Sequence, residues 1–253
     1  MRCGALYDDV VTSRPCGWVG ARSSAQLNAA VAAADAAGGG IVYLPRGQYY
    51  IDGPLIVPNG TTIRGEGEGL VSIFFREDNP DTSPKPGYIY AAPNATSWAI
   101  EDLSIYISHH YYSCIYVHPQ ATSFRMQRVR VRAVAWAMLG DPCPAQTGRG
   151  NRFANFSRAQ VGEVVMLAGN DNYQILDCDL LGTGIIIHTG GHGASQGGSA
   201  TNGVVARNML WNANAAHWFD GIKECIFEWN NVQPAGTAMS WGNNIDNYER
   251  GQC

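Results

Sequence analysis

A short apolar pattern, with anchors at its first, fourth and sixth positions, recurs five times along the chain. The copies begin at Ile100, Met126, Ile175, Val205 and Phe227. Their first positions are 26, 49, 30 and 22 residues apart, and the long step of 49 predicts one degenerate copy near Phe153. Apolar runs repeated at such intervals bury their faces only against the next repeat. The pattern therefore predicts an all-β solenoid, a parallel β-helix in which each coil stacks on the next.

The size and charge of the chain limit its class. Its 253 residues are 45% hydrophobic and 15% charged, which predicts one continuous domain over residues 1–253 with coils over 41–245. The formal net charge is -4 and the 17 lysines and arginines form no basic run, so we expect no nucleic-acid partner. No stretch approaches about 18 apolar residues, so we expect no membrane span. The start has no apolar signal core and the repeats stop near residue 245 without a cap, so we expect a fragment of a longer chain.

One helix is expected ahead of the coils, over residues 24–37. Ser23 or Ser24 can serve as its N-cap, and the three glycines at 38–40 end it. One stripe of the helix is apolar: Leu27, Ala30, Val31 and Ala34. Short strands separated by Gly and Pro follow at close spacing, which is typical of coils with three strands each. A helix in this position would cap the open end of the solenoid.

This N-terminal region resembles a known group of proteins. The runs Gln26–Ala30, Ala37–Tyr49 and Thr62–Gly67 are similar to the capping helix and first coils of pectate-lyase-like right-handed parallel β-helix proteins. That superfamily includes polysaccharide lyases, glycoside hydrolases and phage tailspikes. The resemblance implies a right-handed β-helix with an N-terminal capping helix, and an extended polysaccharide as partner.

Two sectors carry candidate chemistry, and the first contains Asp171 and His192. The sequence Gly191-His192-Gly193 resembles the Gly-His-Gly motif of polygalacturonases, and Gly221-Ile222-Lys223 is similar to their later basic motif. The resemblance implies inverting hydrolysis, with Asp171 as one of two carboxylates. Asn170 stands where those enzymes have a second carboxylate. The alternative is a Gly- and Ser-rich loop that contains a solvated histidine.

The second sector is His217, Trp218, Phe219 and Asp220, which we expect in the turn between two repeat strands, with Lys223 following within reach. A histidine beside a carboxylate can act as acid or base near neutral pH, and Lys223 can neutralise a uronate. The candidate catalytic residues of the chain are thus Asp171, His192, His217, Asp220 and Lys223. The alternative is that Trp218 and Phe219 fill the core while His217 and Asp220 bond the turn backbone.

Four further side chains are expected to contact the glycan. These are Trp211, Trp218, Trp241 and His188. Aromatic rings can form platforms for sugars, although burial in the core is the common alternative use. Trp211 directly follows the last apolar anchor of its repeat, Leu210, so we expect it to be exposed.

The register of the repeats places polar side chains in rows. One row is Asp102, Arg128, Asp177 and Arg207; a second is Arg130 and Asp179; a third is Asn208 and Asn230. Alternating charge along an outward row predicts ion pairing between rungs, and the asparagines predict a stacked ladder. Asp177-Cys178-Asp179 is accordingly interpreted as scaffold, with Cys178 facing inward.

Cysteines and sequons favour an extracellular location. The chain has seven cysteines, and Asn-x-Ser/Thr sequons occur at Asn59, Asn94 and Asn155. Cys3 and Cys16 are the best candidates for a disulfide, and Cys253 for an unpaired thiol. Free cysteine is also a good core residue, so the alternative is that these cysteines are unpaired thiols packed in the core.

The leading hypothesis is an extracellular glycoside hydrolase or polysaccharide lyase acting on an extended glycan, with or without uronate units. The alternative is a non-catalytic glycan-binding, adhesin or structural β-helix module. No cofactor and no metal site is expected, except that a lyase of this fold could use Ca²⁺. His188 and His192 are expected in a Gly-rich turn and not on a helix, which argues against zinc. Oligomeric state does not follow from the sequence.

Overall fold

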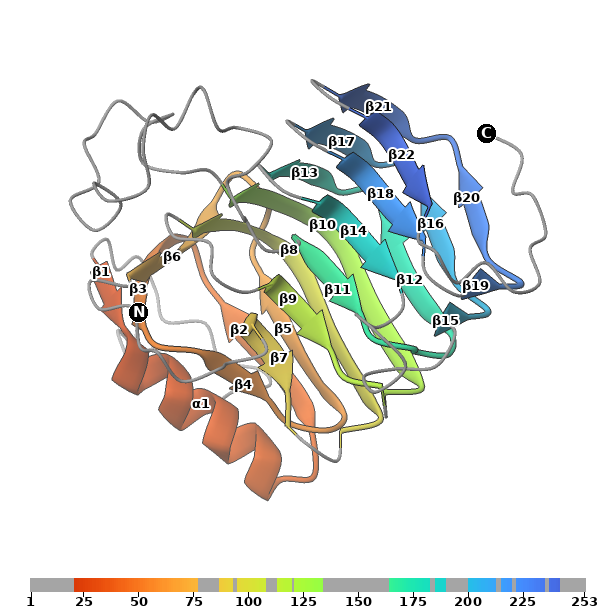
Figure 1. Cartoon of the computed structure of the whole chain (residues 1–253). Coiled ribbons are helices and arrows are strands. Elements are labelled where there is room, and N and C mark those ends of the chain that lie inside the picture. The colour runs from red at the N-terminus through yellow and green to blue at the C-terminus, as the bar shows by residue number, and fades with distance from the viewer. Residues whose placement is uncertain are drawn as a thin grey trace, which may run out of the picture.

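A computed structural model describes residues 21–76, 87–92, 95–107, 113–119, 121–133, 164–182, 185–189, 200–212, 215–219, 222–234 and 237–241. Helix α1 (Ser24–Ala36) lies across one end of a stack of parallel strands, and the C-terminal strands form the other end (Figure 1). The fold class expected from the sequence is confirmed: the chain is a parallel β-helix with an N-terminal capping helix.

The strands form three columns, and successive coils contribute one rung to each. The first column contains β2 (Gly40–Leu44), β5 (Thr61–Gly65), the first half of β8 (Ser97–Ile107) and of β10 (Ser123–Ala133), β12 (Tyr173–Leu176), β16 (Val204–Ala206) and β20 (Ile226–Glu228). The second contains β1 (Ala21–Ser23), β3 (Gly47–Asp52), β6 (Val71–Arg76), the second half of β8 and β10, β13 (Asp179–Gly182), β17 (Met209–Asn212) and β21 (Asn231–Pro234). The third contains β4 (Leu55–Val57), β7 (Gly87–Ala91), β9 (Ser113–Val117), β11 (Val165–Leu167), β14 (Ile185–Thr189), β18 (Ala215–Phe219) and β22 (Thr237–Trp241). Two short strands, β15 (Ala200–Thr201) and β19 (Ile222–Lys223), pair with each other. They precede β16 and β20 of the first column in the chain.

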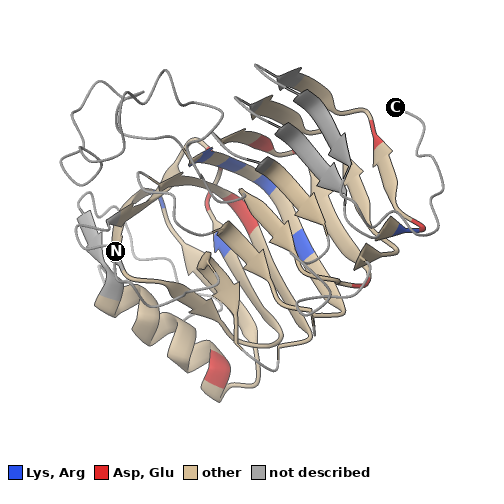
Figure 2. Cartoon of the chain, viewed as in Figure 1, with Lys and Arg blue, Asp and Glu red and all other residues tan. Residues whose placement is uncertain are grey.

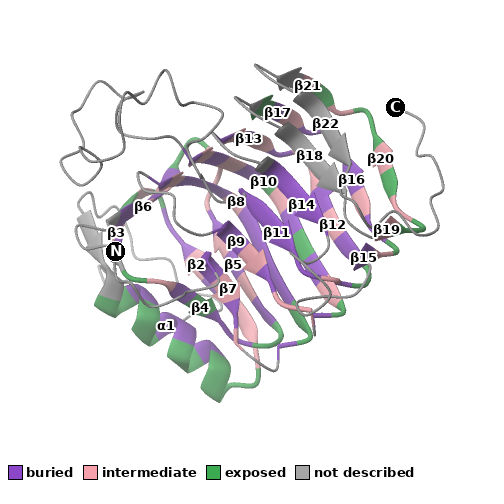
Figure 3. Cartoon of the chain, viewed as in Figure 1, coloured by how far each residue is buried: buried purple, intermediate pink, exposed green. Residues whose placement is uncertain are grey.

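The corner between the first two columns explains the spacing of the repeat. One residue of each coil adopts a left-handed conformation there: Asp102, Arg128, Asp177, Arg207 and Trp229 have φ between 52° and 59°. This residue breaks the two-residue alternation of a strand, so the inward positions become the first, fourth and sixth of each copy. Figure 3 shows buried residues along the strands interrupted by half-buried and exposed ones. The helix contributes its expected stripe, in which Leu27 and Ala34 have no exposed surface.

The long step between the second and third copies is not a missing coil. Phe153 lies outside the described residues, but Met126 of β10 and Ile175 of β12 are direct Cα partners. Adjacent rungs leave no place between them for another strand, so the expected degenerate copy is wrong. The extra residues instead connect β10 to β11 within one coil.

Candidate functional site

Arginines concentrate on the outer face of the first two columns. Strand β10 alone carries Arg125, Arg128, Arg130 and Arg132, and its left-handed corner at Arg128 allows all four to avoid the core. Figure 2 shows charged residues gathered on β8 and β10 near the middle of the stack. We call this outer surface of the first two columns the arginine face. It is a candidate site because it gathers cations in a chain with an overall negative charge.

Asp179 is the centre of a cluster on the second column. Arg130 Nε donates to its Oδ2 at 3.3 Å, Arg132 Nη2 forms an ion pair with the same oxygen, and Trp211 Nε1 donates to its Oδ1 at 3.1 Å. On the other side, Arg130 Nη2 lies 2.7 Å from Glu68 Oε1. The Asp179 cluster therefore holds two guanidinium groups and one indole ring in a fixed arrangement. Trp211 is 40% exposed, as expected from the sequence.

A ladder of stacked rings leads to this cluster. The ring centroids of Tyr50 and Phe74 are 5.2 Å apart, and those of Phe74 and Tyr106 are 4.8 Å apart, with nearly parallel planes. The next Cα partner in this row is Arg132. The faces of these rings contact one another between neighbouring rungs. Each stacked pair stabilises the coils by about 0.5–1.5 kcal/mol. The ladder ends with Tyr106 beside the charged cluster, where it interacts electrostatically with Arg130.

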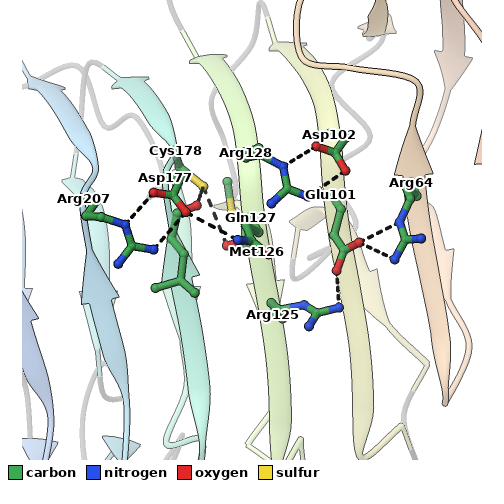
Figure 4. A network of polar contacts seen from close by, with 11 residues as sticks. Arg64, Glu101, Asp102, Arg125, Met126, Gln127, Arg128, Asp177, Cys178 and Arg207 are labelled. Carbon is green, nitrogen blue, oxygen red and sulfur yellow. Dashed lines mark hydrogen bonds and ion pairs between the residues drawn. The ribbon is translucent and has the colours of Figure 1, made fainter.

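The charged row expected at the corner is confirmed. Arg128 Nη2 donates to Asp102 Oδ2 at 2.9 Å, and Arg207 Nη2 donates to Asp177 Oδ2 at 2.9 Å (Figure 4). Gln127 joins the row by donating to Asp177 at 3.4 Å. Each of these ion pairs links neighbouring rungs, as the alternating charges predicted.

A third group lies on the first column. Glu101 is buried, and its carboxylate forms ion pairs with Arg64 on one side and Arg125 on the other (Figure 4). Sequence reasoning did not assign any of these three residues. It also missed Glu68 and Arg132 of the Asp179 cluster. The available signal was the series 125, 128, 130 and 132, in which arginines follow the outward positions of a strand with one corner.

Asp177 on the arginine face has a pKa below its usual range. Side-chain hydrogen bonding from Arg207 is the largest factor that lowers the pKa of Asp177, ahead of the further bond from Gln127. The side chains of the ion-paired carboxylates are 3–34% exposed, whereas those of their arginine partners are 23–51% exposed. Arg132 and Asp179 are equally exposed, at 23% and 24%. In the other pairs the acid is the less exposed partner, so the outer surface there presents N–H donors.

Asp171 and Lys223 lie in one row outside the arginine face. Both are exposed, and Thr201 is the strand partner of each, so they are two rungs apart, roughly 10 Å. Hydrogen bonds from Thr201 and then Asn202 lower the pKa of Asp171. An acid held ionised in this way is not a proton donor near neutral pH.

The expected turn at residues 217–219 is wrong, because these residues belong to strand β18 of the third column. His217 is the Cα partner of Ile187, whose side chain is buried, and Trp218 is the partner of His188. Trp241 in β22 is the partner of Phe219. The structure thus places these residues on a different column from the arginine face. His192 and Asp220 lie outside the described residues.

The expected position and role of His188 are also wrong. It lies in strand β14, not in a turn, and it has no exposed surface. A side chain without exposed surface does not contact a polysaccharide, so His188 is not a substrate contact in this conformation. Of the four expected contacts, Trp211 is the one whose described side chain is exposed beside polar partners.

Comparison with known proteins identifies the family. A family model described as rhamnogalacturonase A/epimerase, pectate lyase-like, matches residues 21–216. The chain belongs to this family. No curated protein matches the sequence significantly. Among solved structures, the A-module of the Azotobacter vinelandii mannuronan C-5 epimerase AlgE4 is 15% identical, with a TM-score of 0.46 over 94% of this chain and 72% of that chain. The A-module of AlgE6 from the same organism is 13% identical, with a TM-score of 0.27 over 98% of both chains.

Membership of the rhamnogalacturonase A/epimerase, pectate lyase-like family supports a carbohydrate-active function on a polysaccharide. Among the described residues, no three His, Cys, Asp or Glu side chains form a group that could hold a metal ion. The acids of the arginine face already bind guanidinium groups. Ca²⁺ needs several oxygen ligands, and positively charged guanidinium groups beside these oxygens do not suit it. No described helix is long and apolar enough to cross a membrane.

The described cysteines are free thiols: Cys114, Cys178 and Cys225. Cys178 is buried, as expected, and burial raises its pKa to about 12. Its thiol is therefore a packing group and not a nucleophile near neutral pH. The expected Cys3–Cys16 disulfide and Cys253 lie outside the described residues.

Proposed function

We propose that this protein binds an acidic, uronate-containing polysaccharide on its arginine face and cleaves it by β-elimination. The observation that carries the proposal is the layering of charge on this face, where the guanidinium groups of Arg64, Arg128 and Arg207 are more exposed than the carboxylates that they bind. Guanidinium binds carboxylate in a bidentate manner, which suits a uronate better than a neutral sugar.

The Asp179 cluster is the proposed centre of the reaction. Elimination requires removal of the proton at C5, α to the uronate carboxyl, followed by cleavage of the C4–O4 bond. The electron pair of the C–H bond forms the C4=C5 double bond, and the leaving O4 takes up a proton. Arg130 and Arg132 would donate their remaining N–H groups to the carboxyl group as negative charge develops on it. Trp211 would offer its exposed ring to an adjacent sugar.

Tyr106 is the proposed acid–base residue. It ends the aromatic ladder, and its Cα partner on the next rung is Arg132 of the Asp179 cluster. A positioned phenol can exchange protons with a reacting carbon or oxygen. Its ring is fixed by stacking on Phe74, which keeps the hydroxyl in place during the reaction.

Elimination is favoured over hydrolysis by the state of the carboxylates. Inverting hydrolysis needs a protonated carboxylic acid to donate to the leaving oxygen. On the described part of the arginine face, the carboxylates of Glu68, Glu101, Asp102, Asp177 and Asp179 are each paired with arginine. Each of these carboxylates already accepts from a guanidinium group, so none is placed as the free acid that inverting hydrolysis requires.

The same pairing favours a second candidate, a glycan-binding module without turnover. A face whose acids all bind arginine can hold an anionic polymer through its exposed donors while no carboxylate is available as a base. This alternative keeps the ligand and the binding surface, and it removes the chemical step.

An activity screen separates these functions. Polyuronates and neutral polysaccharides are incubated with the protein, with Ca²⁺ or with a chelator, while reducing ends and the ultraviolet absorbance of unsaturated uronate are recorded. Elimination gives both signals, and hydrolysis gives reducing ends alone. Incubation in D₂O adds a third readout, since proton removal without cleavage exchanges H5 for deuterium. Binding with none of these signals identifies the non-catalytic module.

Two conservative variants test the role of Tyr106. Tyr106→Phe removes one hydroxyl and keeps the stacked ring, so turnover should fall by about a hundredfold or more while polymer binding is retained. Tyr50→Phe is the matched control, because Tyr50 belongs to the same ladder and its hydroxyl bonds Gln48, away from the cluster. Full turnover by Tyr106→Phe would exclude this assignment.

A tryptophan pair tests the platform. Trp211→Ala should weaken polymer binding several-fold, because ring contacts of this kind contribute about 0.5–1.5 kcal/mol. Trp229 is 81% exposed and lies at the corner, outside the Asp179 cluster, so Trp229→Ala serves as the control. Equal binding by both variants would remove Trp211 from the site.

The proposed substrate also determines where the protein works. A polysaccharide does not diffuse across membranes, so we propose that the protein acts outside the cell. Secretion of the natural protein with its N-terminus sequenced from the medium would test this, and its recovery only from the cell interior would contradict it.

A further inference from the structure

The Arg64–Glu101–Arg125 group on the first column, here called the Glu101 triad, is built differently from the other ion pairs of the arginine face. Arg64 Nε and Nη2 each lie 2.7 Å from Glu101 Oε2, and Arg125 Nη2 forms an ion pair with Oε1. The side chain of Glu101 is 3% exposed, while those of Arg64 and Arg125 are 36% and 45% exposed. One buried carboxylate is thus shared between two partly exposed cations from the rungs on either side.

Charge balance separates the triad from its neighbours. Asp102 pairs with Arg128 and Asp177 with Arg207, one acid for one base. In the Asp179 cluster, two acids face two arginines. Among the described groups of the face, the triad is therefore the place where one positive charge is in excess.

The neighbours of the triad do not compensate this charge. The Cα partners of Arg125 on the two adjacent rungs are Ala99 and Gln174, and the remaining partner of Arg64 is Tyr43. None of these side chains is acidic. The charge of Glu101 balances one of the two arginines, and the charge of the other is left over.

Donors also remain for a ligand. A guanidinium group has five N–H donors, and the contacts with Glu101 use Nε and Nη2 of Arg64 and only Nη2 of Arg125. We infer that the Glu101 triad is a second anion subsite, which binds a carboxylate of the glycan between Arg64 and Arg125. The inference rests on the proposed function for the source of that carboxylate, and on the structure for the excess charge.

The position of the triad defines the ligand. Arg125 and Arg130 are five residues apart on β10, and the corner at Arg128 lies between them, so the chain between the triad and the Asp179 cluster spans at most about 16 Å. One uronate cannot reach both places, whereas an oligosaccharide of several residues can. The subsite therefore selects polymers that carry at least two acidic sugars, because the second contact becomes intramolecular once the first has formed.

Binding measurements by calorimetry test the subsite with Arg125→Gln, which leaves Arg64 to pair with Glu101. An oligouronate long enough to reach both clusters should bind this variant about tenfold more weakly than wild type, the effect of losing one charged hydrogen-bonded contact. The monomeric uronate and a carboxyl-reduced oligosaccharide of equal length should bind both proteins alike. Arg46→Gln is the control, since Arg46 forms a separate one-to-one pair with Glu66 at 2.7 Å.

Three results would overturn the inference: equal oligouronate affinity in wild type and Arg125→Gln, an equal loss in Arg46→Gln, or tight binding of the carboxyl-reduced oligosaccharide. Inorganic sulfate is titrated in parallel, and sulfate binding as strong as that of the oligouronate would assign the triad to a free anion instead. Arg64→Gln is the second variant if Arg125→Gln does not fold, because Arg125 then remains with Glu101. A protein that binds in this way without turnover would refute the proposed elimination and leave the subsite standing.

Discussion

Asn208 allows the stability of the coil stack to be tested at one side chain. It is 2% exposed and occupies the inward position after the corner. Its Oδ1 accepts from the backbone N–H of Cys178 at 2.9 Å, and its Nδ2 donates to the carbonyl of Ile175 and to Oδ1 of Asn230, both at 2.9 Å. The asparagine ladder expected from the sequence is thus confirmed, and it links three successive rungs.

Replacing Asn208 by Ala leaves two backbone groups of the preceding rung without their partner. Each buried, unsatisfied group costs about 1–3 kcal/mol, so we expect a loss of about 2–6 kcal/mol in the free energy of unfolding. Urea titration followed by circular dichroism measures this loss. Asn230 is half-buried at the last described rung of its row, and Asn230→Ala should cost less.

A second substitution separates hydrogen bonding from volume. Asn208→Leu fills the same space, and Leu103 occupies the equivalent buried position three coils earlier. If the hydrogen bonds matter, Asn208→Leu is no more stable than Asn208→Ala. Recovery of wild-type stability by the leucine, or a cost below about 1 kcal/mol for the alanine, would refute the reasoning.

Two further perturbations follow from packing and charge. Gly203→Ala should lower stability by about 1–3 kcal/mol in the same urea assay, because its Cβ would lie 2.0 Å from Cζ of the buried Tyr173, whereas Gly69→Ala meets open space and should be neutral. The pKa of Asp177 is lowered in the folded state, chiefly by the hydrogen bond from Arg207, so its contribution is complete above about pH 4 and is lost as the pH falls through the folded value. Melting temperature measured against pH should therefore fall less steeply in acid for Arg207→Gln than for wild type; equal slopes would contradict the assignment.

The sequence was sufficient for the register because the corner leaves a local pattern. Anchors at positions one, four and six indicate a single left-handed residue between two strands, and this fixes which side chains face outward. Asp102 and Arg128 could thus be paired from spacing alone, 26 residues apart. The capping helix was equally accessible, because its apolar stripe and the glycines after it are local features.

The third column and the arginine face could not be predicted in the same way. Strand β18 follows the second column at a distance set by loops of variable length, so His217 had no periodic marker and was placed in a turn. Glu101 was missed because it is a charged residue inside a buried strand. Its burial is possible because Arg64 and Arg125 from other coils form ion pairs with it. Such a site exists only once the rungs are stacked.

The unequal coils have a consequence for how such a molecule can change. Ten residues, 190–199, separate β14 from β15, whereas two, 220 and 221, separate β18 from β19, yet the strands that follow remain in register. Residues can thus be inserted or removed between the third column and the short strands β15 and β19, while the strands of the first column keep their spacing. Evolution could therefore vary the length of this loop and leave the arginine face unchanged.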